Sequence, residues 1–186
     1  MHTYFLRRSL VDPDFLEVVL DGSVVQEIKV PFAIRHIPSS FATQEDVEAW
    51  LRQTEYKLVK GYASWLLSRR SYSKASLQQK LQAKKFSSLM CSQVIEEFER
   101  LGYLSDSDFS EMIIRQKMNQ GYGPYYIERY LKEKGLPHHL VREEMSEKKQ
   151  KEAIKKWLLK MRGKDRMKIV AFLLRRGFDL SVIQCM

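Results

Sequence analysis

One pattern of residues occurs three times in this sequence. LQQKLQAKKF at residues 77–86 is followed by IERYLKEKGL at 127–136 and by IVAFLLRRGF at 169–178. Each copy has an apolar pair four residues apart, then a basic residue, a turn and a hydrophobic anchor. Repetition at a spacing of about 40 to 50 residues is typical of stacked helical repeats. We therefore predict a mainly α-helical fold of three tandem three-helix repeats in an elongated, curved array.

The ends of the predicted helices carry capping residues. Gly135 and Gly177 stand where a helix C-cap glycine belongs, whereas Lys85 at the equivalent position predicts a less sharp end for the first copy. Ser73 is a candidate N-cap, and Pro137 is expected in a first turn. The repeats are predicted at 56–103, 104–149 and 150–186, with helices at 56–69, 74–85 and 88–101, at 106–119, 124–134 and 137–147, and at 150–161, 165–176 and 179–186.

Residues 1–43 differ in kind from the rest of the chain. Short β-branched runs at 15–20 and 24–30 flank Asp21-Gly22, and this dipeptide indicates a β-hairpin because both residues tolerate positive φ. Residues 4–10 are a candidate third strand. A sheet this small is marginal alone, so we expect it to pack on the first helix or on a partner. Thr43 and Asp46 form a predicted capping box that begins a connecting helix at 44–55.

Composition limits the classes of protein to which the chain can belong. No run of about 18 apolar residues is present, so no membrane span is predicted. The N-terminus lacks the apolar core of a secretory signal peptide. Two cysteines are too few for a disulfide framework, so a reduced, cytoplasmic setting is expected.

The net charge of +9 is unevenly distributed along the chain. Residues 1–50 hold four basic and eight acidic residues, whereas residues 51–104 hold ten basic and four acidic ones. Residues 105–149 are neutral, and residues 150–186 combine ten basic residues with three acidic ones. Basic surfaces attract nucleic acid or acidic proteins, although solvated lysine-rich helices are also common.

Three ordered segments resemble the RecX family of regulatory proteins. LLSRRSYS at 66–73, followed by Leu77 and Leu81, resembles the family signature L-x-x-R-x-Y-S-x-x-E-L-x-x-K-L. LGYLSDSDF at 101–109 resembles G-Y-L-D-D-x-x-F-A, and GYGPYYI at 121–127 resembles G-x-G-P-x-x-I. Together they cover roughly residues 56–147, and the third repeat matches only in pattern.

The resemblance implies a modulator of the RecA recombinase, with roles in DNA repair, recombination and the SOS response. Such proteins bind the RecA–DNA filament, limit its growth and reduce its ATPase and coprotease activities. The sequence departs from the family at Ser76, Ser105 and Ser110, where glutamate, an acid and alanine are usual. Serine caps a helix as well as aspartate does, and losing the acid at 76 costs at most about 1 kcal/mol, so we expect the fold to survive.

Basic residues are the candidate partner-binding residues. Lys84, Lys134 and Arg176 are equivalent in the repeat, so regularly spaced cations could meet regularly spaced acids or phosphates on a polymer. Each also lies in the last turn of a predicted helix, where a cation complements the helix dipole. Arg69 and Arg70 end the first helix of repeat one. The densest positive region, a candidate for DNA phosphates or an acidic groove and alternatively a solvated face, contains Lys155, Lys156, Lys160, Arg162, Lys164, Arg166 and Lys168.

The aromatic residues divide into two groups. Those on apolar stripes are predicted to be core residues rather than base-stacking platforms: Trp65, Trp157, Tyr130 and Phe172. The second group crowds a turn and either packs between repeats or anchors an interface: Tyr122, Tyr125 and Tyr126.

No catalytic, metal or cofactor site is predicted, so we do not expect an enzyme. His138 and His139 are adjacent on a predicted helix and therefore point in different directions. Gly121-Tyr-Gly lacks the length and the Lys-Ser/Thr of a phosphate loop. Two other functions stay open beside RecA regulation: direct binding of single- or double-stranded DNA through basic repeats one and three, and a helical scaffold for another protein. In each case we expect a monomer.

Overall fold

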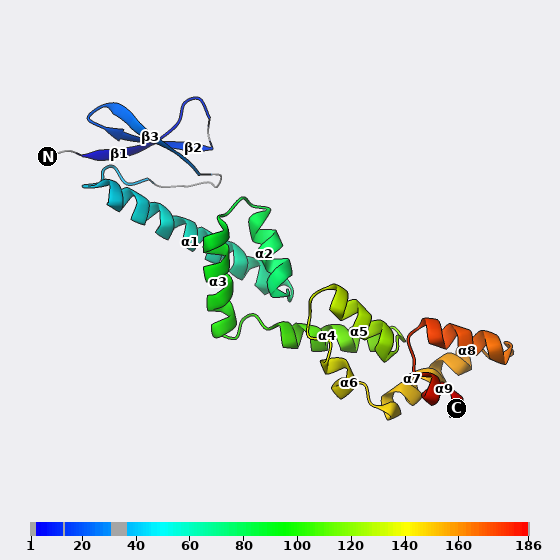
Figure 1. The fold of residues 1–186 in the computed structure, drawn as a ribbon. Coiled ribbons are helices and arrows are strands. Elements are labelled where there is room, and N and C mark those ends of the chain that lie inside the picture. The colour runs from blue at the N-terminus through cyan, green and yellow to red at the C-terminus, as the bar shows by residue number, and fades with distance from the viewer. Residues whose placement is uncertain (1–2, 13, 31–36, 186) are drawn as a thin grey trace. The chain divides into compact units, whose positions relative to one another are not determined.

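The protein, seen as a computed structural model, forms two compact units at residues 1–104 and 105–186 (Figure 1). The structure describes residues 3–12, 14–30 and 37–185. Three strands and helices α1 to α3 belong to the first unit, and helices α4 to α9 belong to the second. The predicted fold class is confirmed, because the chain is mostly helical with a small N-terminal sheet.

The N-terminal sheet is antiparallel, with its strands in the order β1 (Tyr4–Arg8), β2 (Phe15–Leu20) and β3 (Ser23–Lys29). Asp21 and Gly22 join β2 to β3 with φ angles of 50° and 84°. Both angles are positive, as the predicted hairpin turn requires, so the hairpin is confirmed. Strand β1 also confirms the candidate third strand, in a shorter form.

The sheet packs on the first helix, which was one of its two predicted partners. Figure 1 shows the strands lying along the N-terminal half of α1 (Gln44–Arg69). Apolar side chains from the sheet, the connecting segment and the helix are buried together in one cluster: Leu6, Leu16, Val18, Val30, Phe41 and Val47. This burial supplies the second layer that three short strands need in order to be stable.

Helix α1 is a single helix of 26 residues, so the predicted boundary between a connecting helix at 44–55 and repeat one lies inside it. It begins with the predicted capping box: the backbone N–H of Asp46 donates to Thr43 Oγ1 at 3.1 Å, and that of Thr43 donates to the Asp46 carboxylate at 3.0 Å. Beyond the sheet, Val59 and Leu66 contribute to the core of repeat one. One helix therefore serves two packing partners.

Helices α2 (Lys74–Gln82) and α3 (Ser88–Arg100) complete the first three-helix repeat. Ser73 caps α2 as predicted, and Ser76 closes a reciprocal capping box. The Ser76 N–H donates to Ser73 Oγ at 3.2 Å, and the Ser73 N–H donates to Ser76 Oγ at 2.9 Å. The serine at 76 therefore satisfies the backbone donor that a glutamate would otherwise accept from.

Helix α2 ends with the same backbone form as α5 (Pro124–Glu133) and α8 (Arg166–Arg175). Lys85 has φ of 63°, beside 66° for Gly135 and 82° for Gly177. Helix α2 nevertheless ends at Gln82, one residue earlier in the repeat than the ends of α5 and α8, so a less sharp end for the first copy stays a prediction. A lysine can adopt this left-handed conformation at a cost of about 1–2 kcal/mol, which the packing of repeat one offsets.

A polar cluster ties α3 to α1. Glu97 accepts hydrogen bonds from the Tyr56 hydroxyl and from Lys60, whose Nζ lies 2.8 Å from a carboxylate oxygen. The bonds from Lys60 and Tyr56 hold the pKa of Glu97 below its ordinary value. In return, the Glu97 carboxylate raises the pKa of Lys60.

This cluster predicts that the first unit loses stability in acid. The contribution of Glu97 is fully present above its pKa in the unfolded chain, near 4.5, and is lost as the pH falls through the lowered pKa of the folded state. We therefore expect Glu97→Gln to be less stable at neutral pH and to show a smaller acid-induced decline in the free energy of unfolding. Urea unfolding followed by circular dichroism from about pH 7 to about pH 3 measures both quantities.

Glu99→Gln is the matched control, because Glu99 lies on the same helix and pairs with Lys74 while its side chain is 49% exposed. If the free energy of unfolding of Glu97→Gln fell as steeply in acid as that of the unchanged protein, the loss of stability would not come from Glu97.

The second unit has one hydrophobic core shared by repeats two and three. Its main members are Ile114, Ile127, Leu131, Ile154 and Leu173, all essentially inaccessible to solvent. The helices that contribute are α4 (Asp106–Asn119), α5, α6 (Leu140–Glu144), α7 (Glu147–Lys160), α8 and α9 (Leu180–Gln184). Ser105 caps α4, and the Ser110 hydroxyl, which is fully buried, donates to the Asp106 carbonyl at 2.6 Å. Both departures from the family pattern are thus accommodated.

The third helix of repeat two is shorter than predicted. Pro137 precedes α6 rather than lying in its first turn, and the buried Met145 leaves the helical conformation with φ of −111° and ψ of 68°. Helix α7 then begins at Glu147, three residues before the predicted start of repeat three. In the part of the chain that the structure describes, no helix combines the length and the apolarity needed to cross a membrane.

Candidate partner-binding surface

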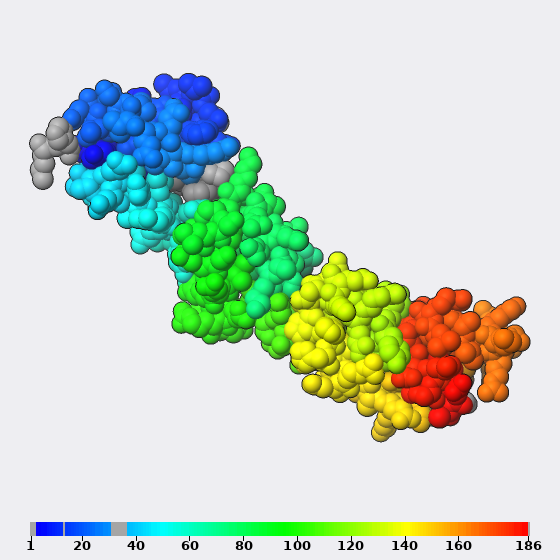
Figure 2. Space-filling model, in the orientation of Figure 1, coloured from blue at the N-terminus to red at the C-terminus, as the bar shows by residue number. Residues whose placement is uncertain are grey.

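The densest group of predicted partner-binding residues surrounds the turn from α7 to α8. Met161 is buried in this turn, Gly163 has φ of 84°, and Asp165 caps α8 by accepting from the N–H groups of Met167 and Lys168. The turn belongs to the orange end of the second unit in Figure 2. Seven exposed side chains, here named the α7–α8 basic cluster, surround it: Lys155, Lys156, Lys160, Arg162, Lys164, Arg166 and Lys168.

The α7–α8 basic cluster is strongly positive, because residues 155–168 hold seven basic residues and one acidic residue, Asp165. Among the residues that the structure describes, no carboxylate lies within ion-pairing distance of any of its seven cations. The preceding lysines differ, because Lys149 pairs with Glu144 at 3.6 Å and Lys151 pairs with Glu147 at 2.5 Å. Positive charge therefore accumulates at the turn, which suits phosphates or a carboxylate-rich surface.

A cleft of about 290 Å³ lies beside the cluster, between the end of α4 and one face of α7. Lys156, Trp157 and Lys160 line one wall, and Asn119 and Glu152 also border it. The Trp157 indole N–H donates to the Gly121 carbonyl at 3.0 Å, which fixes that wall. The lining mixes both signs of charge, so the cleft does not define an anion site of its own.

Lys84, Lys134 and Arg176 all lie at helix ends, but their surroundings differ. Lys84 is exposed, with its Nζ 5.6 Å from the centre of the Tyr62 ring. Lys134 is exposed at the C-cap of α5. Arg176, the C-cap of α8, is only half-exposed. A role for the three cations in partner binding stays a prediction.

Arg176 lies inside an aromatic cage that joins repeats two and three. Its guanidinium carbon is 4.5 Å from the Tyr122 ring centre, 4.6 Å from that of Trp157 and 5.3 Å from that of Phe172. Its Nη1 also donates to the Gln120 carbonyl at 3.1 Å. Stacking on several rings combined with a hydrogen bond gives Arg176 a structural role in the second unit.

The backbone beside Arg176 makes an equally close contact. The Gly123 N–H donates to the Arg176 carbonyl at 2.8 Å, and the Tyr125 N–H donates to the Gly177 carbonyl at 3.0 Å. A Cβ on Gly123 or Gly177 would lie closer than 3.0 Å to backbone atoms of the other segment. The two glycines are therefore required for the contact between the repeats.

Two of the three tyrosines near this contact follow the packing interpretation. Tyr122 and Tyr126 stack with their ring centres 4.0 Å apart and pack against the shared core. Tyr125 is 49% exposed, and its hydroxyl lies 3.4 Å from the Asp179 carboxylate. The sequence alone did not decide between packing and an interface, because the decision depends on where α8 lies.

Three of the four aromatic residues predicted to be core residues pack against the core of the second unit: Trp157, Tyr130 and Phe172.

The prediction that Trp65 is a core residue is wrong, because its side chain is 48% exposed. It stacks on Tyr62 at 5.7 Å between ring centres, and the Arg69 guanidinium lies 4.5 Å from its ring centre. Arg70 instead lies 4.6 Å from the ring centre of Tyr72. The structure thus brings Arg69 and Lys84 to the same aromatic pair.

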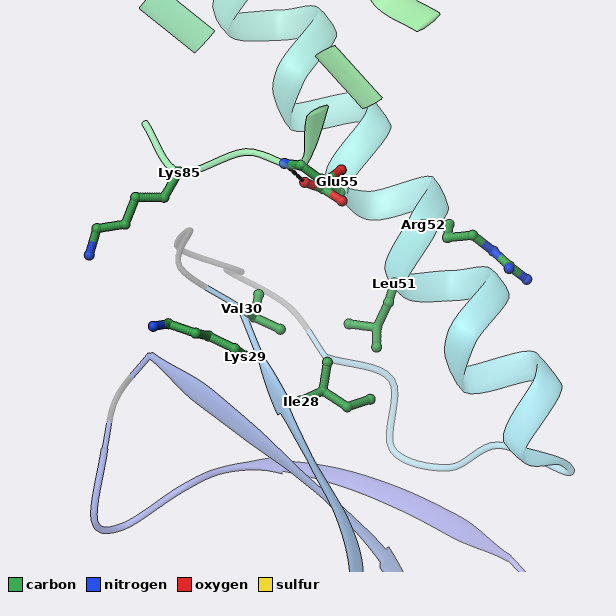
Figure 3. Close-up of a pocket in the computed structure, with 8 residues that line it drawn as sticks. Ile28, Lys29, Val30, Leu51, Arg52, Glu55 and Lys85 are labelled. Carbon is green, nitrogen blue, oxygen red and sulfur yellow. Dashed lines mark hydrogen bonds between the residues drawn. The ribbon is translucent and has the colours of Figure 1, made fainter. Parts of the chain in front are cut away.

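A second cleft, of about 500 Å³, separates β3 from α1. Figure 3 shows Ile28 and Leu51 facing one another across it, with Lys29 and Lys85 extending to one side. Two of its four charged groups contact neighbouring segments of the chain. Lys85 lies 3.7 Å from the Asp14 carboxylate, and Glu55 accepts the Ser87 N–H at 2.6 Å. No residue of this cleft was predicted from the sequence to bind a partner, because its lining depends on how the sheet packs.

The described residues contain no group of three or more His, Cys, Asp or Glu side chains arranged to hold a metal ion. Cys91 is buried, and burial raises the pKa of its thiol, while Cys185 is exposed.

These observations define a class of protein: helical repeats joined to a small sheet, with exposed basic surfaces suited to binding. Residues 105–145 match the family described as RecX, second three-helix domain. Regulatory protein RecX of Legionella pneumophila strain Corby is 39% identical over 127 residues, which cover 63% of this chain and 85% of that protein. A regulatory protein RecX of Thermus thermophilus is 31% identical over 121 residues, covering 65% of this chain and 84% of that protein. The chain therefore belongs to the RecX family of regulatory proteins.

Solved structures of the same family share the fold. A crystal structure of regulatory protein RecX superposes with a TM-score of 0.70 across 99% of this chain and 98% of that chain, at 16% identity. RecX from Lactobacillus salivarius superposes with a TM-score of 0.61 across 70% and 93%, at 22% identity. At such low identity the likeness concerns the fold alone.

Proposed function

We propose that this chain binds the filament that RecA forms on DNA and inhibits the recombinase, ATPase and coprotease activities of that filament. The observation that carries the proposal is an exposed, unneutralised basic cluster on a member of the RecX family. A RecA–DNA filament offers regularly repeated phosphates and protein surface, and cations at a turn can reach either. We expect the chain to act in the cytoplasm as a monomer.

In this proposal the α7–α8 basic cluster contacts phosphates, and the exposed cations of the other repeats add further contacts. Lys84 and Lys134 project from equivalent helix ends, and Arg69 and Arg70 belong to the same repeat as Lys84. Arg176 contributes mainly by joining repeats two and three, because its guanidinium is already stacked and hydrogen bonded. The inhibition is steric and electrostatic, and no cofactor takes part.

The test is the rate of ATP hydrolysis by RecA on single-stranded DNA, with this chain added well below one copy per RecA subunit. We expect inhibition, because one chain bound at a filament end or in its groove affects many subunits. No inhibition in excess, together with no binding to preformed filaments, would overturn the proposal.

Reversal of the charge at both Lys84 and Lys134 should weaken this inhibition. Reversal at Lys57 and Lys132, which are exposed but not equivalent in the repeat, is the matched control.

Direct nucleic-acid binding is the second candidate function, and the unneutralised α7–α8 basic cluster favours it. A chain that only binds nucleic acid would bind DNA equally well without RecA, with an affinity that falls steeply as salt rises. Comparing naked DNA with RecA-coated DNA at several salt concentrations separates the two functions.

A further inference from the structure

The side chains around Trp65 form an unusual exposed surface on the first unit. Tyr62, Trp65 and Arg69 lie on one stripe of α1, three and four residues apart, and Lys84 approaches from the end of α2. We name these four residues the Trp65 patch. Tyr62 is partly buried against the core of repeat one, which fixes the position of the patch on the first unit. Trp65 is 48% exposed.

The indole of Trp65 is held between its neighbours on the helix. Tyr62 stacks on it with an angle of 16° between the rings, and the Arg69 guanidinium lies 4.5 Å from its centre. Since Tyr62 lies one turn before Trp65 and Arg69 lies one turn after it, the two groups flank the indole along the helix. Tyr62 and Arg69 therefore already contact the indole ring, and the rest of its surface is open to a partner.

The patch lies in a long segment without any acidic residue. Residues 56–95 contain no aspartate or glutamate, whereas their basic residues are Lys57, Lys60, Arg69, Arg70, Lys74, Lys80, Lys84 and Lys85. Three of these, Lys60, Lys74 and Lys85, pair with acids from other segments. No described carboxylate pairs with Arg69 or Lys84, so the patch combines an exposed aromatic anchor with uncompensated positive charge.

We propose that the Trp65 patch docks on an acidic protein surface, with the indole edge entering a pocket and with carboxylates of the partner meeting Arg69 and Lys84. Tryptophan, tyrosine and arginine are the residues that most often dominate protein interfaces. Stacking holds all three in place before binding, which lowers the entropy lost on docking. A single-stranded nucleic acid fits the patch less well, because base stacking requires a free ring face.

This inference rests on the proposed function, in which the acidic protein is RecA. It assigns a protein contact to the first unit and leaves the phosphate contacts to the α7–α8 basic cluster. Two affinities of the full chain therefore test it: that for RecA filaments on single-stranded DNA, and that for the same DNA without RecA.

We expect Trp65→Ala to weaken binding to the filament by about 30-fold, as truncation of an interface anchor does, and to change the affinity for naked DNA by less than about twofold. The double variant Arg69→Glu/Lys84→Glu should weaken filament binding at least as much. It alters only exposed charges, so it keeps the test valid if Trp65→Ala reduces stability.

Tyr103→Ala and Lys57→Glu are the matched controls, since Tyr103 is 69% exposed on the same unit and Lys57 lies off the Tyr62 stripe of α1. Filament binding by both patch variants at the level of these controls would overturn the inference and leave the proposed function standing. If the patch variants lost as much affinity for naked DNA as for filaments, the patch would bind nucleic acid rather than protein. Failure of the unchanged chain to bind filaments would overturn the proposed function and this inference together.

Discussion

Replacing Gly177 with alanine is expected to destabilise residues 105–186 by at least about 3 kcal/mol. Gly177 has φ of 82°, and a Cβ there would lie closer than 3.0 Å to the backbone nitrogen and the Cβ of Tyr126. The backbone of α5 cannot retreat without lengthening the bond from the Tyr125 N–H to the Gly177 carbonyl, now 3.0 Å. Thermal unfolding should show a midpoint lower by at least about 12 °C. Hydrogen exchange should show that the loss of amide protection is confined to the second unit.

Gly135→Ala is the matched control for this change. Gly135 also follows a helix and has φ of 66°, but a Cβ there would meet nothing within 4 Å. Its substitution should cost only the strain of the left-handed conformation, about 1–2 kcal/mol. If the two alanine variants were equally stable, the close contact between α5 and the end of α8 would not contribute as the geometry indicates.

The comparison of these glycines shows what the sequence could and could not predict. The repeat pattern identified Gly135 and Gly177 as equivalent glycines that follow a helix end, and both adopt the expected left-handed conformation. It could not distinguish them, because the difference lies in a neighbour about 50 residues away in the sequence, Tyr126 against Gly177. Local conformation is encoded locally, whereas a close approach depends on the tertiary packing of two repeats.

The same limit applies to the surroundings of the basic residues. Lys84, Lys134 and Arg176 share a position at a helix end, and the sequence pattern identified it. The aromatic cage around Arg176 assembles residues from α7, from α8 and from the turn before α5, so no local pattern could have predicted it. The exposure of the α7–α8 basic cluster was easier to predict, because closely spaced cations around a turn between two helices remain exposed whatever packs behind them.

Trp65 shows how periodicity overestimates a buried face. The apolar residues of α1 form a wide stripe, but α2 and α3 cover only the part that contains Val59, Ala63 and Leu66. Trp65 lies at the edge of that stripe and was therefore assigned to the core. A tryptophan flanked by a tyrosine three residues earlier and an arginine four residues later fits a stacked surface residue equally well, and this spacing is the signal that was missed.

Neutralising Arg162, Lys164 and Arg166 as glutamines is expected to weaken binding to RecA filaments and to single-stranded DNA by about 100-fold at about 0.1 M salt. Each phosphate contact on a single strand contributes about 0.7 to the slope of log affinity against log salt, so three contacts contribute about 2.1, or about 100-fold at about 0.1 M. The three cations are exposed and, within the described part of the chain, free of ion pairs, so their loss should not affect folding. Fluorescence anisotropy at several salt concentrations measures both the affinity and the slope.

The control removes the same net charge from the same unit at Arg129, Lys149 and Lys151, each of which pairs with a glutamate. A general effect of charge would weaken binding equally in both triple variants and would contradict a specific role for the turn. A loss confined to RecA filaments, with an unchanged affinity for naked DNA, would mean that the turn contacts acidic groups of RecA. Contact with phosphate predicts a smaller slope of log affinity against log salt in the turn variant, both on RecA filaments and on single-stranded DNA, and an unchanged slope in the control. The reason is that counterion release from DNA depends on the contacts made and not on the net charge.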